Sequence, residues 1–201
     1  ALAGCGVLNA LIEINGPEVP ILDGSSLRFV DGILKAGLRS QSAPIRAIRI
    51  LERVEVTDGY GRARLDPAEG FEIAFHINFE QDDAIGLQEK RLDMANGAFV
   101  RELSDARTFC RQSDVDAMQA NGLALGGTLE NAVVVDGDKV MNPEGFRHDD
   151  EAVRHKMLDA LGDLALAGYP ILGRYGGFRA GHALTNTLLR ALFDRPAAWR
   201  L

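Results

Sequence analysis

Large apolar residues occupy every second position between residues 71 and 79, and this alternation constrains the fold more than any other feature. The stretch reads FEIAFHINF, and its apolar positions are Phe71, Ile73, Phe75, Ile77 and Phe79. Side chains two residues apart point to the same face of a β-strand, whereas a helix would scatter them around its axis. One face of this strand must therefore be buried, so the chain is expected to build a sheet covered by apolar elements.

Helical patterns occur on both sides of this strand in the sequence. Apolar residues at helical spacing predict helices over 27–34, 149–167 and 183–193. The dipeptide Asp58-Gly59 between two strand-like stretches predicts a β-hairpin. The apolar residues 7–14 suit a further strand. Helices and strands mixed in this way predict an α+β fold.

A polar stretch rich in helix and strand breakers, over 39–44, divides the chain. We expect a domain boundary there, between residues 1–42 and residues 43–201. A small insertion of strand and helix is expected at about 110–142 of the second domain. The first four residues, ALAG, read as the last turn of a helix that closes on a glycine, so the chain is expected to begin within an element.

Composition and charge exclude several classes of function. Of 201 residues, 46% are hydrophobic and 25% charged, as in globular proteins. The net charge is -7 and the basic residues are scattered, which argues against nucleic-acid binding. Apolar runs fall far short of the roughly 20 residues of a membrane-spanning helix. Cys5 and Cys110 have no paired spacing, which is typical of a reducing compartment, so the cytoplasm is the expected location.

One polar row on the predicted helix over 149–167 carries the candidate chemistry. His155, Asp159 and Asp163 are spaced at i, i+4 and i+8, which places them on one face of a helix. A histidine and a carboxylate one turn apart can bind a divalent metal from the same side, although such pairs are also common on solvated faces. His182 follows the glycine-rich run 173–181, which is expected to be a loop, and stands at the start of the last helix, with Asp163 as its available carboxylate.

The stretches around these residues resemble the bacterial UDP-3-O-acyl-N-acetylglucosamine deacetylase family, the zinc amidases of lipid A synthesis. The matching motifs, in the family's order and spacing, are PEVPILDGSS (17–26), ARTF (106–109), NGLALGG (121–127), NPEGFRHDDE (142–151), RHKMLDALGD (154–163) and AGHALTN (180–186). Together they span nearly the whole chain. The resemblance implies two similar α+β domains of helices packed on sheets, a β-α-α-β sandwich with the active site between the domains. Residues 1–42 would be the C-terminal part of the first domain, which is truncated here, and residues 43–201 would be the second.

The resemblance also implies a role for each candidate residue. His155 and Asp159 would be ligands of Zn²⁺. His182 would be the catalytic histidine, and Asp163 would orient or charge it. Thr108 would hydrogen-bond the acetyl oxygen as it becomes an oxyanion. Substrate contacts are implied for Lys156 at the polar groups of the nucleotide sugar, for Phe79 at the uracil, and for Phe109, Val115, Ala124 and Ala132 along an apolar passage for the fatty acyl chain.

The chain departs from the family's pattern in three places. The family's Glu-His metal motif lies about one helical turn before the ALAG that stands here at residues 1–4. A missing N-terminal segment would therefore supply the third zinc ligand and the general base. The family's Phe-x-His-Pro reads FEQD at 79–82, which alters the local uridine contacts, and the hairpin at 58–62 lacks a lysine found in some members.

The sequence thus predicts a zinc-dependent amide hydrolase. It would remove acetate from UDP-3-O-(3-hydroxyacyl)-N-acetylglucosamine, the committed step of lipid A synthesis. The alternative is a catalytically incomplete binding fragment, which keeps the site for the acylated nucleotide sugar but needs an upstream segment for activity. Metal analysis and turnover of this chain, and of one extended upstream, would distinguish the two.

Overall fold

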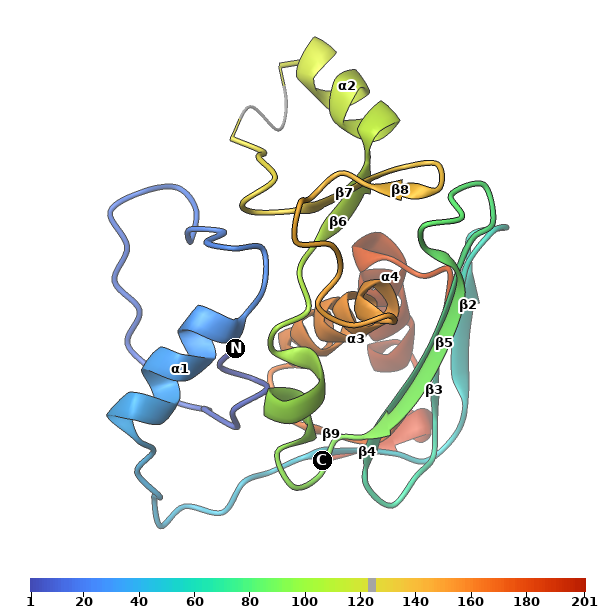
Figure 1. Ribbon diagram of the computed structural model, residues 1–201. Helices are drawn as coiled ribbons and strands as arrows, with labels where there is room; N and C mark the ends of the chain where they lie inside the picture. The colour runs from blue at the N-terminus through green and yellow to red at the C-terminus, as the bar shows by residue number, and fades with distance from the viewer. Residues whose placement is uncertain (123–125) are drawn as a thin grey trace.

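A computed structural model describes residues 1–122 and 126–201 and shows a mixed α and β architecture (Figure 1). In chain order the elements are α1 (Leu27–Ala36), β1 (Ile48–Ile50), β2 (Val54–Thr57), β3 (Arg62–Asp66), β4 (Phe71–Phe79), β5 (Gly86–Asp93), β6 (Phe109–Arg111), α2 (Gln112–Ala120), β7 (Val133–Asp136), β8 (Lys139–Val140), α3 (Glu151–Leu164), β9 (Ile171–Phe178), α4 (His182–Phe193) and β10 (Trp199–Arg200). A π-helical turn covers Phe99–Leu103, and 3-10 turns cover Ala165–Ala167 and Pro196–Ala198. The predicted α+β class is confirmed.

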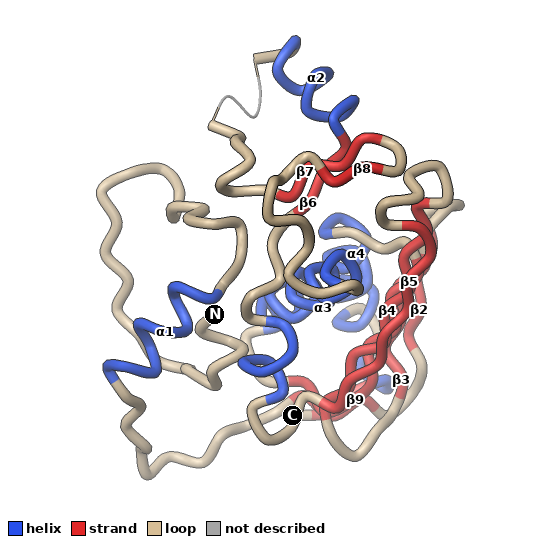
Figure 2. Tube along the Cα trace, in the orientation of Figure 1, coloured by secondary structure: helices blue, strands red, loops and turns tan. Residues whose placement is uncertain are grey.

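A seven-stranded sheet forms the framework of the fold, and β9 is its central strand. β9 pairs in parallel with β4 and, at its first residues, with β1, and it pairs antiparallel with β3. The sheet continues from β1 to β10, from β3 to β2 and from β4 to β5, each pair antiparallel. The helices α3 and α4 contact strands of this sheet and each other (Figure 2).

The central strand, β9, was not predicted from the sequence. Its glycine-rich run was expected to be a loop before the last helix, and this expectation is wrong. Glycine is disfavoured in strands, but here neighbouring side chains lie against the backbone. A Cβ atom at Gly173 would lie 2.6 Å from Ile50 Cγ1, and one at Gly177 would lie 2.6 Å from Phe75 Cε2. The glycines therefore make room for the side chains of the adjacent strands.

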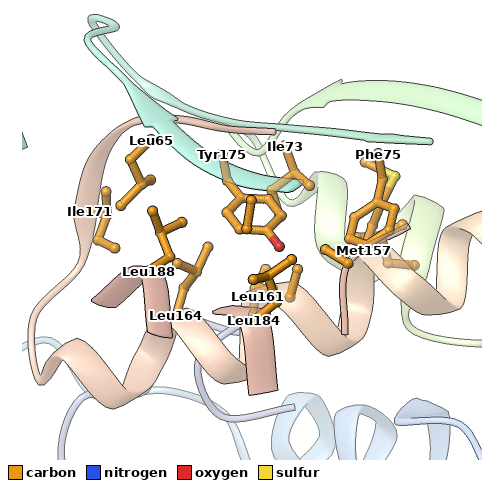
Figure 3. Packing of buried hydrophobic residues seen from close by; sticks show 14 of the residues in the cluster. Leu65, Ile73, Phe75, Met157, Leu161, Leu164, Ile171, Tyr175, Leu184 and Leu188 are labelled. Atoms are coloured by element: carbon orange, nitrogen blue, oxygen red, sulfur yellow. The ribbon is translucent and has the colours of Figure 1, made fainter. Parts of the chain in front are cut away.

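The alternation in β4 is confirmed, and it defines the core. Ile73, Phe75 and Ile77 are at most 4% exposed, whereas the residues between them are half-buried. On the face that α3 and α4 cover, side chains of the sheet meet side chains of the helices (Figure 3). The labelled core residues are Leu65, Ile73, Phe75, Ile171 and Tyr175 from strands, and Met157, Leu161, Leu164, Leu184 and Leu188 from helices.

The predicted hairpin and helices are confirmed. β2 and β3 pair antiparallel, and the Asp58 carboxylate accepts hydrogen bonds from the backbone N–H groups of Tyr60 at 3.1 Å and Gly61 at 2.6 Å. Gly59 has a φ of 91°, which favours glycine in this turn. The helix predicted over 149–167 is α3 with its 3-10 extension, and it ends at Gly168 in the left-handed conformation.

The N-terminal region differs from one expectation. Residues 7–14 form no strand, and residues 8–14 are exposed, so their apolar pattern finds no sheet partner in this structure. α1 follows as predicted and buries Val30. The expected insertion contains α2 and a separate three-stranded sheet in the order β6, β7, β8. The boundary between residues 42 and 43 and the similarity of two domains stay predictions.

Candidate active site

α3 carries His155, Asp159 and Asp163 along one face, as their spacing predicts. His155 Nε2 lies 3.2 Å from Asp159 Oδ1, and Lys156 Nζ donates a hydrogen bond to Asp159 Oδ2 at 2.7 Å. The side chains of the row are 8%, 16% and 18% exposed, in chain order. The row is therefore mostly withdrawn from water and differs from an ordinary solvated helix face.

His182 is the first residue of α4 and meets this row from the neighbouring helix. Its Nδ1 lies 2.9 Å from Asp163 Oδ1 and 3.0 Å from Oδ2. Its Nε2 lies 3.8 Å from Asp159 Oδ2, and the side chain is 67% exposed. One edge of the imidazole is thus anchored by a carboxylate, while the other stays accessible to a ligand.

A buried hydrogen-bond chain fixes the start of α4. Thr185 Oγ1 donates to the carbonyl oxygen of Gly181 at 3.2 Å, and the Tyr175 hydroxyl lies 2.9 Å from Thr185 Oγ1. Because the Thr185 proton is used toward Gly181, the Tyr175 hydroxyl is the donor between them. Burial raises the pKa of Tyr175 to about 12. The central strand β9 therefore helps to place the residue that precedes His182.

This burial makes the stability of the protein sensitive to alkaline pH. Below pH 10 the Tyr175 hydroxyl keeps its proton in both the folded and the unfolded protein. Above pH 10 it ionises first in the unfolded protein, so its contribution to the stability of the folded protein is lost as the pH rises toward 12. Between pH 10 and pH 12 we expect ionisation of Tyr175 to lower the free energy of unfolding by about 2 to 3 kcal/mol. Tyr175→Phe should be less stable at neutral pH by about 1 kcal/mol but should decline less steeply.

Urea titrations at a series of pH values measure this effect. Tyr60→Phe is the matched control, because Tyr60 is 81% exposed. If the free energy of unfolding fell equally with alkaline pH in the wild type and in Tyr175→Phe, the raised pKa of Tyr175 would be contradicted.

The orientation of His155 is set by a backbone carbonyl. His155 Nδ1 lies 3.0 Å from the carbonyl oxygen of Ala106, which can only accept a hydrogen bond, so Nδ1 carries a proton. The Nε2 atom then faces Asp159 Oδ1. A lone pair and a carboxylate oxygen at this distance repel each other unless a proton or a shared cation lies between them. This donor pair therefore fits a divalent metal ion.

Aromatic rings connect the row to the strands around it. The Phe109 ring packs edge-on against His155 with centroids 6.4 Å apart, and against Phe79 at 5.5 Å. Lys156 Nζ lies 5.8 Å from the centroid of Phe109. The structure thus brings three of the predicted substrate-contacting residues, Lys156, Phe79 and Phe109, next to the His155 row.

The other predicted residues that the structure describes lie in α2 or next to β6 and β7. The Thr108 backbone N–H donates to the Gly24 carbonyl at 2.8 Å, which fixes the residue before Phe109. Val115 on α2 and Ala132 before β7 are half-buried, and Ala124 lies outside the described residues. Over 1–122 and 126–201, no group of three or more His, Cys, Asp or Glu side chains is arranged to hold a metal. No helix in the same ranges is long and apolar enough to cross a membrane.

The two carboxyl groups of the row titrate in opposite directions. Burial by itself raises the pKa of Asp159, but hydrogen bonds and positive charge from Lys156, and from His155 whenever its imidazole is doubly protonated, outweigh it and hold that pKa well below its usual range. Burial also raises the pKa of Asp163, against the opposing hydrogen bond from His182. Carboxyl groups whose pKa values are pushed apart can serve different chemical roles in one site.

Comparison with known proteins identifies the family. Residues 1–194 match the family described as UDP-3-O-acyl N-acetylglycosamine deacetylase. The chain belongs to this family. A relative from Phenylobacterium zucineum, named UDP-3-O-acyl-N-acetylglucosamine deacetylase, is 55% identical over 201 residues, which are 100% of this chain and 68% of the relative.

Two further relatives carry the same name. The protein of Acidithiobacillus ferrooxidans is 48% identical over 200 residues, 99% of this chain and 66% of the relative. That of Shewanella violacea is 46% identical over 202 residues, 100% of this chain and 66% of the relative. The chain spans about two thirds of the length of these deacetylases.

Two residues beside His155, Glu151 and Arg107, were not predicted from the sequence. Glu151 and Arg107 form a buried ion pair with Nε to Oε1 at 2.9 Å, and their side chains are 1% and 3% exposed. Glu151 stands four residues before His155, so the i, i+4 row begins one helical turn earlier than the predicted row of His155, Asp159 and Asp163. That spacing was the available signal, but a glutamate in the first turn of a helix is usually solvated.

Proposed function

We propose that this protein is a zinc-dependent amide hydrolase that removes acetate from UDP-3-O-(3-hydroxyacyl)-N-acetylglucosamine, a step of lipid A synthesis in the cytoplasm. The observation that supports the proposal is that two pairs of side chains, His155 with Asp159 and His182 with Asp163, lie next to each other. His155 and Asp159 face each other at 3.2 Å on α3, and His182 on α4 is anchored on Asp163 at 2.9 Å. The names of the relatives supply the substrate.

The zinc site is proposed from the donors of this chain. His155 through Nε2 and Asp159 through Oδ1 would hold the ion. A catalytic zinc, when bound, supplies a water whose pKa is lowered to about 7 and polarises a carbonyl group. Because such a site takes three protein ligands, the upstream segment predicted from the sequence would complete it and would also carry the general base.

The protein groups around the scissile amide have separate tasks. His182 donates a proton from Nε2 to the departing amine, and the hydrogen bond to Asp163 stabilises the charged imidazole. Thr108 Oγ1 donates a hydrogen bond to the acetyl oxygen as negative charge develops there. The exposed edge of His182 leaves room for the substrate to approach.

Substrate recognition extends from this centre toward the small sheet. Lys156 contacts polar groups of the nucleotide sugar, and Phe79 stacks on the uracil. The acyl chain follows an apolar passage lined by Phe109, Val115, Ala124 and Ala132. The position of Phe109 between His155 and Phe79 supports this path, because one ring borders both the reacting centre and the uracil contact.

A charge in the acyl passage is expected to act selectively. Val115→Glu should raise KM for the acylated substrate by about tenfold, because an apolar contact of roughly 1.5 kcal/mol is lost, and should leave KM for a substrate without the acyl chain unchanged. Gln119→Glu adds the same charge at an exposed position of α2 and serves as the control. Equal changes for both substrates would argue against a passage at Val115.

Acetate release tests the proposed reaction directly. The chain is assayed with zinc and UDP-3-O-(3-hydroxymyristoyl)-N-acetylglucosamine, alone and as a fusion that begins with the upstream segment of the Phenylobacterium relative. Zinc-dependent acetate release by the fusion is expected. Substrate binding without acetate release in both forms would instead support a binding module.

A further inference from the structure

One peptide unit beside His155 is held at both of its polar atoms by the same helix. The unit joins Ala106 to Arg107. Its carbonyl oxygen accepts the hydrogen bond from His155 Nδ1 at 3.0 Å, and its N–H donates to Glu151 Oε1 at 2.9 Å. Glu151 and His155 lie one turn apart on α3. The helix thus fixes the plane of this peptide through two side chains.

The Glu151 carboxylate is itself held by buried donors. Arg107 donates to it from Nε at 2.9 Å and from Nη2 at 3.1 Å, and the Arg147 backbone N–H donates at 2.6 Å. The Arg107 guanidinium is anchored further by Glu144 at 2.7 Å and by the Gly145 carbonyl at 2.7 Å. Both oxygens of Glu151 are therefore engaged, and the carboxylate has little freedom to move.

We propose that Glu151 and Arg107 are positioning residues that select the tautomer of His155. If the peptide flipped, its N–H would face Nδ1, and that nitrogen would have to accept rather than donate. The imidazole proton would then lie on Nε2 and point at Asp159. Glu151 opposes this flip because its carboxylate can only accept a hydrogen bond and so needs the Arg107 N–H on its side.

The consequence for metal binding rests on the proposed function. A histidine binds zinc through an unprotonated nitrogen, and the hydrogen bond made by the other nitrogen determines which one is free. Glu151 and Arg107 hold the Ala106 carbonyl, the carbonyl holds the proton on Nδ1, and Nε2 is left free. Loss of such outer partners typically weakens metal binding by about 10- to 100-fold.

The test replaces the whole ion pair rather than one partner. Removing a single partner leaves a buried charge and destabilises the fold strongly, whereas apolar residues of similar volume often preserve stability. The variant is therefore Arg107→Met/Glu151→Met. Arg107→Lys, which keeps the charge but loses the bidentate contact, is the second variant if the first does not fold. Val54→Ala, a buried change in β2, is the control for lost stability alone.

Two readouts are measured on each folded protein. Histidine ¹H–¹⁵N correlation spectra of the metal-free protein at alkaline pH report the tautomer, and His155→Gln assigns the signal among the 4 histidines. Competition with a fluorescent chelator reports zinc affinity and is measured on the same variants in the fusion that carries the upstream segment. Wild type and Val54→Ala are expected to show the Nδ1–H form. The double variant should show the Nε2–H form or a mixture and should bind zinc at least about tenfold more weakly; Arg107→Lys should change in the same direction by less.

The outcomes separate this inference from the proposed function. An unchanged Nδ1–H signal of His155 in a folded double variant would overturn the positioning role of Glu151 and Arg107, as would an Nε2–H signal of His155 in the wild type. A tautomer change in the double variant, with no zinc binding by any of the fusions, would support the positioning role and count against the zinc site.

Discussion

Replacing His182 by alanine is expected to lower kcat/KM for the acylated nucleotide sugar by on the order of 10³-fold, with zinc retained. Asp163→Asn should lower it by on the order of 10²-fold, because the imidazole loses the carboxylate that stabilises its charged form. The reason is geometric: Nδ1 of His182 lies 2.9 Å and 3.0 Å from the two Asp163 oxygens. Activity is measured on the form that releases acetate.

The double variant decides whether the two residues work as one unit. Groups that act together in catalysis lose activity non-additively, so His182→Ala/Asp163→Asn should be little worse than His182→Ala alone. Thr187→Ala, at an exposed position of α4, is the control for changes to the helix. If the combined loss equals the product of the two single losses, the residues act independently and at least one role is wrong.

Removing either proposed ligand should abolish tight zinc binding. His155→Ala and Asp159→Ala each remove one of two donors that face each other at 3.2 Å, so zinc affinity should fall more than the roughly 100-fold that loss of an outer partner can cause. The loss is measured as the zinc content of the fusion that carries the upstream segment, after dialysis against a weak chelator. Asp163→Asn is the matched control, because it removes a carboxylate from the same helix face without removing a ligand.

Stoichiometric zinc in both alanine variants would contradict the ligand assignment. Loss of zinc in Asp163→Asn as well would place Asp163 among the ligands rather than beside His182. Circular dichroism of each variant shows whether the helix is intact, since Asp159 also forms an ion pair with Lys156 on the native helix face.

Local periodicity determined much of this structure. The alternation over 71–79 predicted a half-buried strand, the spacing over 149–167 predicted the long helix, and Asp58-Gly59 predicted the hairpin. The same spacing placed His155, Asp159 and Asp163 on one helix face. These features depend on residues close together in the sequence, and the roles given to the site residues came from the family resemblance.

Only the tertiary structure decided the remaining features, because they depend on contacts between distant residues. The run at 173–178 becomes the central strand because side chains such as Ile50 and Phe75 lie against its glycines. The apolar residues at 7–14 stay outside the sheet, because a strand forms only where the backbone of a neighbouring strand pairs with it. His155 is oriented by a carbonyl 49 residues away and held by the buried pair of Glu151 and Arg107. The sequence by itself determined which side chains share a helix face, and the packing of segments distant in sequence decided how those side chains are oriented.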